Sequence, residues 1–347
     1  MLLRLPRFVD VRAGEGLPVL LSCLYVACVV AAFLLAKPLR NSLYLREYGP
    51  YALVYAYVAV PVVLWVFVTV YAAVARRVGT RRASVGTLVF FSLNVVWFWW
   101  AFRTGRFPLL PAAFYVWVNC FGVIAPVQAW SFANSLFDAR QAKRVFGLIG
   151  AGASLGAIAG GLLARFLVVP VGGTVNLLLV LAALILSAAV IVAFASQRLT
   201  RRRTTPRRGR PSRPFAHTAR SIAASRYLRL LAVLVVLVAV VTQWVAFQLS
   251  LVASARFGDD ADALTRFFGE FNFTLGVIGF LLQLLLTARA LRVFGVGAVV
   301  LLLPITLAFS SAFTVLVPVF LTVLLTNAAD QSLRFSVDKA AYELLYL

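Results

Sequence analysis

Residues on which catalysis and metal binding depend are scarce in this chain of 347 residues, which contains three Cys and one His. Cys23, Cys28 and Cys120 all lie in apolar runs, so we expect them to pack as small apolar side chains. Their spacing gives neither a disulfide framework nor a metal motif. No paired catalytic carboxylates and no Ser-His-Asp or Cys-His set can be assembled. The sequence therefore predicts that the protein is not an enzyme and that it uses no cofactor.

Acidic residues are also scarce, since 11 Asp and Glu accompany 33 Lys and Arg and leave a net charge of +22. In a soluble protein this excess would favour nucleic acid as a partner. Here 63% of the residues are hydrophobic and the mean hydropathy is +0.95. A soluble domain cannot bury that much apolar surface, so the surrounding solvent must be lipid. We predict a membrane protein whose partner is the lipid bilayer and not nucleic acid.

About ten apolar runs are long enough to cross a bilayer. They cover residues 17–36, 51–75, 83–102, 108–133, 146–168, 174–196, 228–255, 268–288, 295–316 and 318–335. With the N-terminus in the cytoplasm, most Lys and Arg residues fall in cytoplasmic loops, as the positive-inside rule requires. The segment before the first run is too polar for a cleavable signal peptide. We therefore expect a multi-pass protein of the bacterial inner membrane with a cytoplasmic N-terminus.

A basic, proline-containing segment, residues 197–227, divides the apolar runs into two groups. Its composition is typical of a cytoplasmic linker. The sequence thus predicts a six-helix bundle over residues 1–196 and an incomplete second bundle over residues 228–347. Six helices, a long inside loop and further helices follow the plan of the major facilitator superfamily. The predicted fold is an all-α, two-bundle transporter that contains about ten of the roughly twelve helices of that superfamily.

Two stretches of the chain, residues 126–158 and 318–347, repeat one another weakly. Each leads an apolar helix into a charged end and then to a Lys followed three residues later by an aromatic residue. These lysines are Lys143 and Lys339. A weak repeat between the halves of a very hydrophobic chain is typical of pseudosymmetric transporters, so this pattern favours a transport function.

Polar residues near the membrane-spanning runs are the candidates for substrate binding. Lys37 and Arg40 share a helix face if the first helix continues past Pro38. Two neighbouring cations suit a phosphate or carboxylate, whereas snorkelling to the lipid headgroups is an equally weighted alternative. Glu270 either favours a helix start, the preferred interpretation, or acts as a coupling carboxylate. The complete predicted set is Lys37, Arg40, Asn134, Glu270, Gln283 and Lys339.

A second set of charges clusters at the predicted cytoplasmic ends of two helices. Asn327, Asp330 and Arg334 follow helical steps along one stripe. Charges at membrane depth usually face a cavity or a partner, so this stripe either binds the ligand or forms salt bridges that lock the two halves. We assign the gating role to Asp138, Lys143, Arg144, Asp330, Arg334 and Asp338.

Three glycines, Gly152, Gly156 and Gly160, repeat every four residues. A nucleotide-binding glycine loop would need a preceding strand or a Lys-Ser/Thr ending, and neither is present. Small residues at this spacing let membrane helices approach closely. We therefore expect the stripe to be a helix-packing surface.

Four stretches together resemble a known family. They read VDVRAGEG, AKPLRNSLYLREYG, WSFANSLFDARQAKRVFGLIGAGASLGAIAGG and DQSLRFSVDKAAYELLYL. They are similar to the ATP/ADP translocase (NTP/NDP exchange transporter) family, a bacterial branch of the major facilitator superfamily. The resemblance implies an antiporter that binds ATP and exchanges nucleotides by alternating access. It also implies that Lys37 and Lys339 meet the phosphates of the substrate.

Two motifs depart from those of the ATP/ADP exchangers. The chain reads KPLRNSL after the first run, where the exchangers carry an Arg-Asp-Thr-Lys type, and DKAAY near the end, where they carry a Lys-Glu-Met-Ala-Tyr type. Both departures resemble the free-living bacterial relatives, some of which are fused to helical-repeat domains, so a downstream soluble domain is left open. The expected substrate is a nucleotide or another phosphorylated small molecule. Transport of another substrate such as lipid and a non-transporting sensor or anchor module are the alternatives.

Overall fold

The computed structural model describes residues 15–199, 225–285, 306, 309 and 320–333. Every secondary-structure element within these residues is an α-helix, as predicted. The helices are α1 (Gly16–Tyr48), α2 (Leu53–Val78), α3 (Thr80–Thr104), α4 (Leu110–Leu136), α5 (Ala139–Phe166), α6 (Leu177–Leu199), α8 (Arg226–Phe257), α9 (Ala261–Leu285) and α11 (Phe320–Leu333). Arg334, Asp338 and Lys339 lie outside the described residues.

Six of the described helices, α1 to α6, are long and apolar enough to cross a membrane. They coincide with the first six predicted runs, so the prediction of a multi-pass membrane protein is confirmed. Lipid favours such apolar helices. A helix satisfies its own backbone hydrogen bonds, so only its side chains face the hydrocarbon.

Helix α1 is longer than the sequence predicted. The first apolar run ends at residue 36, but the helix does not end there. It continues through Pro38 to Tyr48 and contains 33 residues, a length of about 50 Å at 1.5 Å per residue. Pro38 removes one backbone hydrogen bond, but membrane helices tolerate proline where neighbouring helices surround it, and Pro38 is buried. Lys37 and Arg40 therefore lie within a helix and not at its end.

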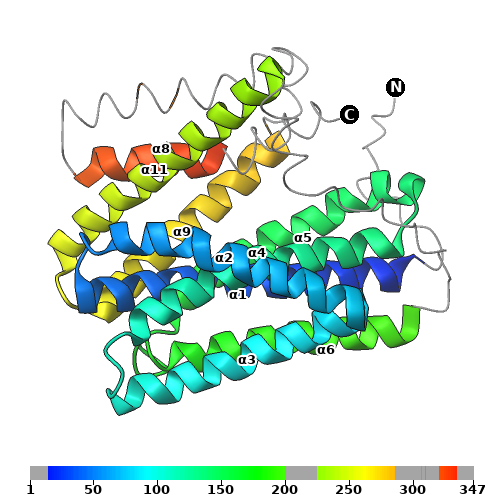
Figure 1. Cartoon of the computed structure of the whole chain (residues 1–347), viewed down its shortest axis with the longest axis horizontal. Helices are drawn as coiled ribbons and strands as arrows, with labels where there is room; N and C mark the ends of the chain where they lie inside the picture. The colour runs from blue at the N-terminus through cyan, green and yellow to red at the C-terminus, as the bar shows by residue number, and fades with distance from the viewer. Residues whose placement is uncertain (1–14, 200–224, 286–305, 307–308, 310–319, 334–347) are drawn as a thin grey trace, which may run out of the picture.

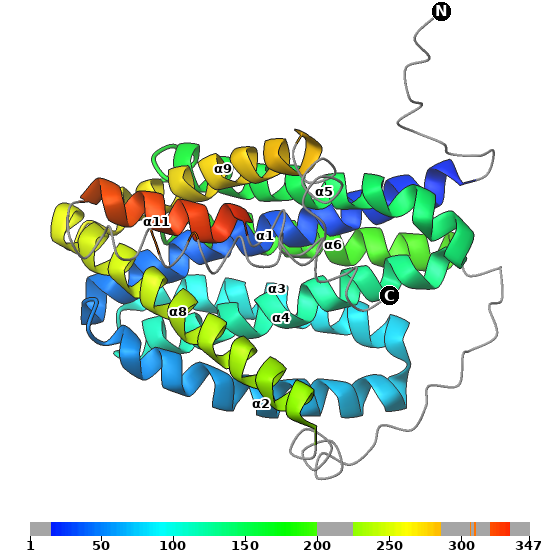
Figure 2. The same cartoon turned by 90° about the horizontal axis from the view of Figure 1, so that it is seen from above.

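Helix α1 occupies the centre of the molecule, where it packs against α4, α5, α6 and α9. Figure 1 shows α3 and α6 along one edge and α8 and α11 along the opposite edge, with α1 between them. Helix α2 packs against α3 and α4, and in the view from above it lies along the edge opposite α9 (Figure 2). The main apolar core joins α1, α3, α4, α5 and α6, and it includes the stacked rings of Trp117 and Phe121.

The glycine stripe of α5 packs against α1, as predicted. A Cβ atom at Gly152 would lie 3.0 Å from the backbone oxygen of Cys23, and one at Gly156 would meet the backbone oxygen of Ala27. Gly160 likewise faces Ala31 of α1, whereas Gly161 faces Phe273 of α9. Because lipid offers no hydrophobic driving force between helices, this close backbone approach stabilises the bundle through van der Waals packing. Helix α5 thereby fixes the position of α9 relative to α1.

Candidate functional site

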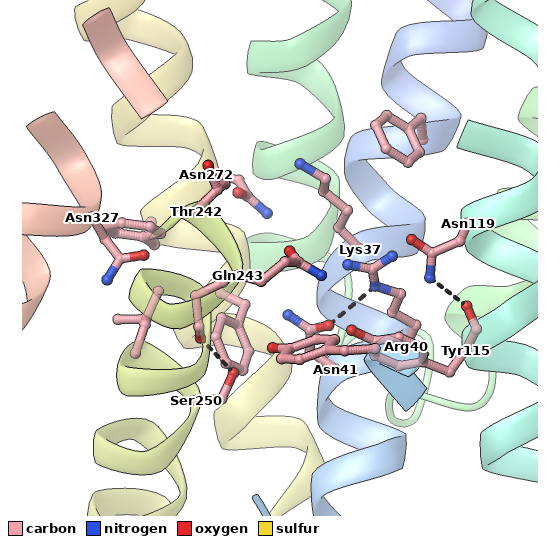
Figure 3. Close-up of a pocket in the computed structure, with 16 residues that line it drawn as sticks. Lys37, Arg40, Asn41, Tyr115, Asn119, Thr242, Gln243, Ser250, Asn272 and Asn327 are labelled. Atoms are coloured by element: carbon pink, nitrogen blue, oxygen red, sulfur yellow. Dashed lines mark hydrogen bonds between the residues drawn. The ribbon is translucent and has the colours of Figure 1, made fainter. Parts of the chain in front are cut away.

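A cavity of about 230 Å³ lies between α1, α2 and α4 on one side and α8, α9 and α11 on the other (Figure 3). Its polar lining consists of Lys37, Arg40, Asn41, Tyr57, Tyr115, Asn119, Thr242, Gln243, Ser250, Asn272 and Asn327, and its apolar lining of Phe33, Ala246, Leu249, Phe268 and Phe271. The described lining residues include two cations and no carboxylate. Charged groups at membrane depth usually face such a cavity because exposure to lipid is costly.

Both cations come from α1 and are partly buried. Since the helix continues past Pro38, Lys37 and Arg40 share a face and line the same cavity. The Lys37 Nζ atom lies 5.1 Å from the centre of the Phe33 ring. The Arg40 guanidinium carbon lies 4.6 Å from the centre of the Tyr115 ring. The arrangement gives this wall a local charge of one sign, which suits an anion.

The facing wall carries neutral amides. Gln243 lies on α8, Asn272 on α9 and Asn327 on α11, and Figure 3 shows the Gln243 side chain pointing toward Lys37 and Arg40. The Asn327 Nδ2 atom donates to the backbone oxygens of Val245, at 2.9 Å, and Val323, at 3.1 Å, so its side-chain oxygen remains as an acceptor. Amides offer both donors and acceptors, which suits a neutral heterocycle.

A second apolar cluster fills the space between the helices at one end of the cavity. It consists of Tyr44, Leu45, Leu53, Ala56, Tyr115, Leu249, Ala253, Leu264, Phe268, Phe271, Leu275 and Val323. The cluster residues of α1 and α2, such as Tyr44 and Leu53, are closer in sequence to the loop at 49–52 than the residues of these helices that line the cavity. On α8 and α9, Ala253 and Leu264 likewise stand nearer to the loop at 258–260. The cavity is therefore closed toward these loops.

Polar contacts add to this closure. The Asp262 Oδ1 atom accepts hydrogen bonds from the backbone N and from the Oγ1 of Thr174, both at 2.7 Å. Thr174 Oγ1 lies 2.9 Å from Thr265 Oγ1, which also hydrogen-bonds Ser42 of α1. We call Ser42, Thr174, Asp262 and Thr265 the Asp262 cluster. It ties α9 to α1 and to the loop between α5 and α6.

Two of the remaining predicted binding residues, Asn134 and Glu270, do not line the described cavity. Asn134 is exposed near the end of α4. Glu270 forms an ion pair with Arg165 of α5 at 3.0 Å and is about half exposed. The preferred interpretation of Glu270 as a helix-start residue is wrong, because α9 begins at Ala261. Gln283 lies in α9, but its side chain is outside the described residues, as is Lys339.

The predicted gating residues are only partly described. Asp138 is the N-cap of α5, and its backbone N–H donates to Gln141 at 3.0 Å. The Arg144 Nη2 atom lies 3.1 Å from Glu15 at the start of α1. This pair joins α5 to α1 and lies within the first six helices. Lys143 and Asp330 lie in α5 and α11, with side chains outside the described residues, so the gate itself stays a prediction.

Sequence reasoning singled out Asn327 on the amide wall but missed Gln243, and it missed Asn41 and Tyr115 beside Arg40. Asn119 and the pair Thr242 and Gln243 interrupt long apolar runs, and such polar interruptions are the available signal. Asn41 and Tyr115 carry no such signal, because Asn41 stands in a polar segment and tyrosine is common at membrane interfaces. Only the packing of the helices brings these residues to one cavity.

Long apolar helices around a polar cavity with two cations are typical of a polytopic membrane protein that carries an anionic solute. A sequence model described as the TLC ATP/ADP transporter family matches residues 44–333. The chain belongs to this family, and it is a nucleotide-exchange membrane transporter. A search of the curated proteins gave no match. The family match begins after Lys37 and Arg40, so the assignment of these two residues rests on the geometry of the cavity.

Proposed function

We propose that the cavity binds ATP and ADP in turn, with the phosphates at the α1 wall and the nucleobase at the wall of α8, α9 and α11. The observation that carries this proposal is the pair Lys37 and Arg40 on one wall of the cavity between the helices. An Arg fork and a Lys point charge together match a chain of phosphate oxyanions. Neutral amides opposite match the donor and acceptor edge of a base.

The proposed mechanism is alternating access between two bundles of the major facilitator type. Residues 1–196 form one bundle, residues 228–347 belong to the other, and residues 197–227 link them. Closure by the second apolar cluster and the Asp262 cluster supports this mechanism, because an exchanger needs one sealed end while the substrate binds. With the N-terminus in the cytoplasm of a bacterium, the sealed end faces away from the cytoplasm. The inner gate of Asp138, Lys143, Arg144, Asp330, Arg334 and Asp338 closes the opposite end in the other state.

Exchange in liposomes tests the proposal. The purified chain is reconstituted with ADP inside, and uptake of labelled ATP is measured with and without internal ADP. We expect uptake that requires internal ADP and that is lost in Lys37→Ala and in Arg40→Ala. Arg165→Ala is the matched control, because this arginine lies outside the cavity in an exposed ion pair. Uptake at the wild-type rate in both cavity variants would refute the assignment of the site.

A further inference from the structure

The guanidinium of Arg40 is supported from two directions. It lies over the Tyr115 ring, with 4.6 Å between the guanidinium carbon and the ring centre. Its Nε atom donates to the Asn41 Oδ1 atom at 3.1 Å, which Figure 3 shows as a dashed line. Stacking uses the face of the guanidinium, whereas hydrogen bonding uses its edge. Both supports therefore leave the two terminal nitrogens to bind a ligand.

The ring beneath Arg40 is itself fixed. Tyr115 is only 4% exposed, and its ring centre lies 5.0 Å from that of Tyr44, which in turn lies 4.9 Å from that of Tyr48. The Tyr44 hydroxyl donates to the backbone oxygen of Ala52 at 2.7 Å, and the Tyr48 hydroxyl donates to the backbone oxygen of Pro108. A row of three tyrosines thus connects Arg40 to the closed end of the cavity.

Lys37 differs from Arg40 in the geometry that it needs, although its ammonium also lies over an aromatic ring, 5.1 Å from the centre of Phe33. An ammonium is a compact charge with three rotatable donors and needs little orientation. A guanidinium binds two oxyanion atoms only when its plane is turned toward them. Holding this plane before the ligand arrives removes part of the ordering cost of binding.

We propose that Tyr115 and Asn41 are positioning residues that hold Arg40 as a two-pronged donor for the phosphate chain, and so set the affinity for phosphate independently of the base. This inference rests on the proposed function, because it needs the phosphates to lie at the α1 wall. Neither residue has to touch the substrate. Their effect on binding passes through Arg40.

The test measures dissociation constants in detergent for ATP and for inorganic triphosphate competing with ATP. The variants are Tyr115→Leu and Tyr115→Phe, each with Arg40 present and in the Arg40→Ala background. We expect Tyr115→Leu to weaken the binding of both ligands by about ten-fold, between the values of an exposed and a desolvated cation–π contact. Tyr115→Phe keeps the ring and should stay within about two-fold. With Arg40→Ala, replacing Tyr115 should have no further effect, because coupled residues are not additive.

Several results would overturn the inference. Equal weakening with and without Arg40 would mean that Tyr115 acts on the fold or touches the ligand directly. Loss of ATP affinity without loss of triphosphate affinity would place Tyr115 at the base. Failure of triphosphate to compete in the wild-type protein would mean that the fork does not bind phosphate. If Arg40→Ala lowers the affinity for ATP but Tyr115→Leu does not, only the positioning role of Tyr115 fails. If Arg40→Ala leaves the affinity for ATP unchanged, the proposed site itself is refuted.

Two controls protect the test. Phe166→Leu removes a ring under another arginine, Arg165, at a similar distance of 5.0 Å but outside the cavity, and should leave both affinities unchanged. If Tyr115→Leu does not fold, Asn41→Ala replaces it, because it removes only the acceptor at the Arg40 Nε atom. We expect Asn41→Ala to weaken both ligands by about five-fold, and no change would contradict the role of Asn41.

Discussion

The two walls of the cavity differ in chemistry although both are built from apolar membrane helices. The α1 wall presents Lys37 and Arg40, whereas the facing wall presents the amides Gln243, Asn272 and Asn327. Charged side chains attract an anion strongly but distinguish one base from another poorly. Neutral amides attract an anion weakly, but their donors and acceptors can distinguish between bases. The difference indicates that the α1 wall provides the affinity for phosphate, whereas the facing wall recognises the base. A ligand that contacts both sides must then bridge them, which couples binding to their relative position.

Removing charge from the α1 wall should have the largest effect. We expect Lys37→Ala to weaken ATP binding by about 100-fold, or about 3 kcal/mol, because a charge-assisted hydrogen bond to phosphate is lost. Binding is measured by calorimetry in detergent, with Arg165→Ala as the control that removes a cation outside the cavity. If Lys37→Ala changed the dissociation constant for ATP by less than about three-fold, the α1 wall would not be the wall that binds phosphate.

Loosening the closed end should change the distance between the walls without changing their chemistry. Asp262→Asn removes the charge that accepts two hydrogen bonds from Thr174. We expect faster labelling of a Ser250→Cys reporter, in a chain free of its native cysteines, by an impermeant reagent added to intact cells. The increase should be about ten-fold if one charge-assisted contact is lost.

Asp259→Asn is the matched control for this experiment, because Asp259 is exposed in the loop just before α9, three residues from Asp262. Unchanged labelling in Asp262→Asn would show that the Asp262 cluster does not hold this end closed. Equal increases in both variants would point to a general effect of charge in the loop.

Changing the amide wall should have the smallest effect and should act on the base alone. Asn272 is 9% exposed and lines the cavity. We expect Asn272→Leu to reduce the preference between ATP and GTP by about five-fold, the value of one neutral hydrogen bond, with inorganic triphosphate unaffected. Competition binding measures both quantities. Asn134→Leu, at an exposed position near the end of α4, is the control, and an effect there would revive Asn134 as a binding residue.

The sequence predicted the class of fold well, because apolar runs of the right length leave helices as the only structure that lipid allows. It placed the end of α1 too early, since Lys37, Pro38 and Arg40 interrupt the run although neighbouring helices keep the backbone helical. It found both cations but not Tyr115 or Asn41, whose importance comes from contact with Arg40. It could not pair Glu270 with Arg165, because that pairing depends on how α5 packs against α9.

Photolabelling with 8-azido-ATP, followed by mapping of the labelled peptide, tests the central claim most directly. This reagent carries its reactive group on the base, so its position reports the wall that the base contacts. The account predicts that the label falls on α8, α9 or α11, near Gln243 or Asn272, and that unlabelled ATP competes it away. Label on α1 near Lys37 and Arg40, or label that ATP does not displace, would contradict the account.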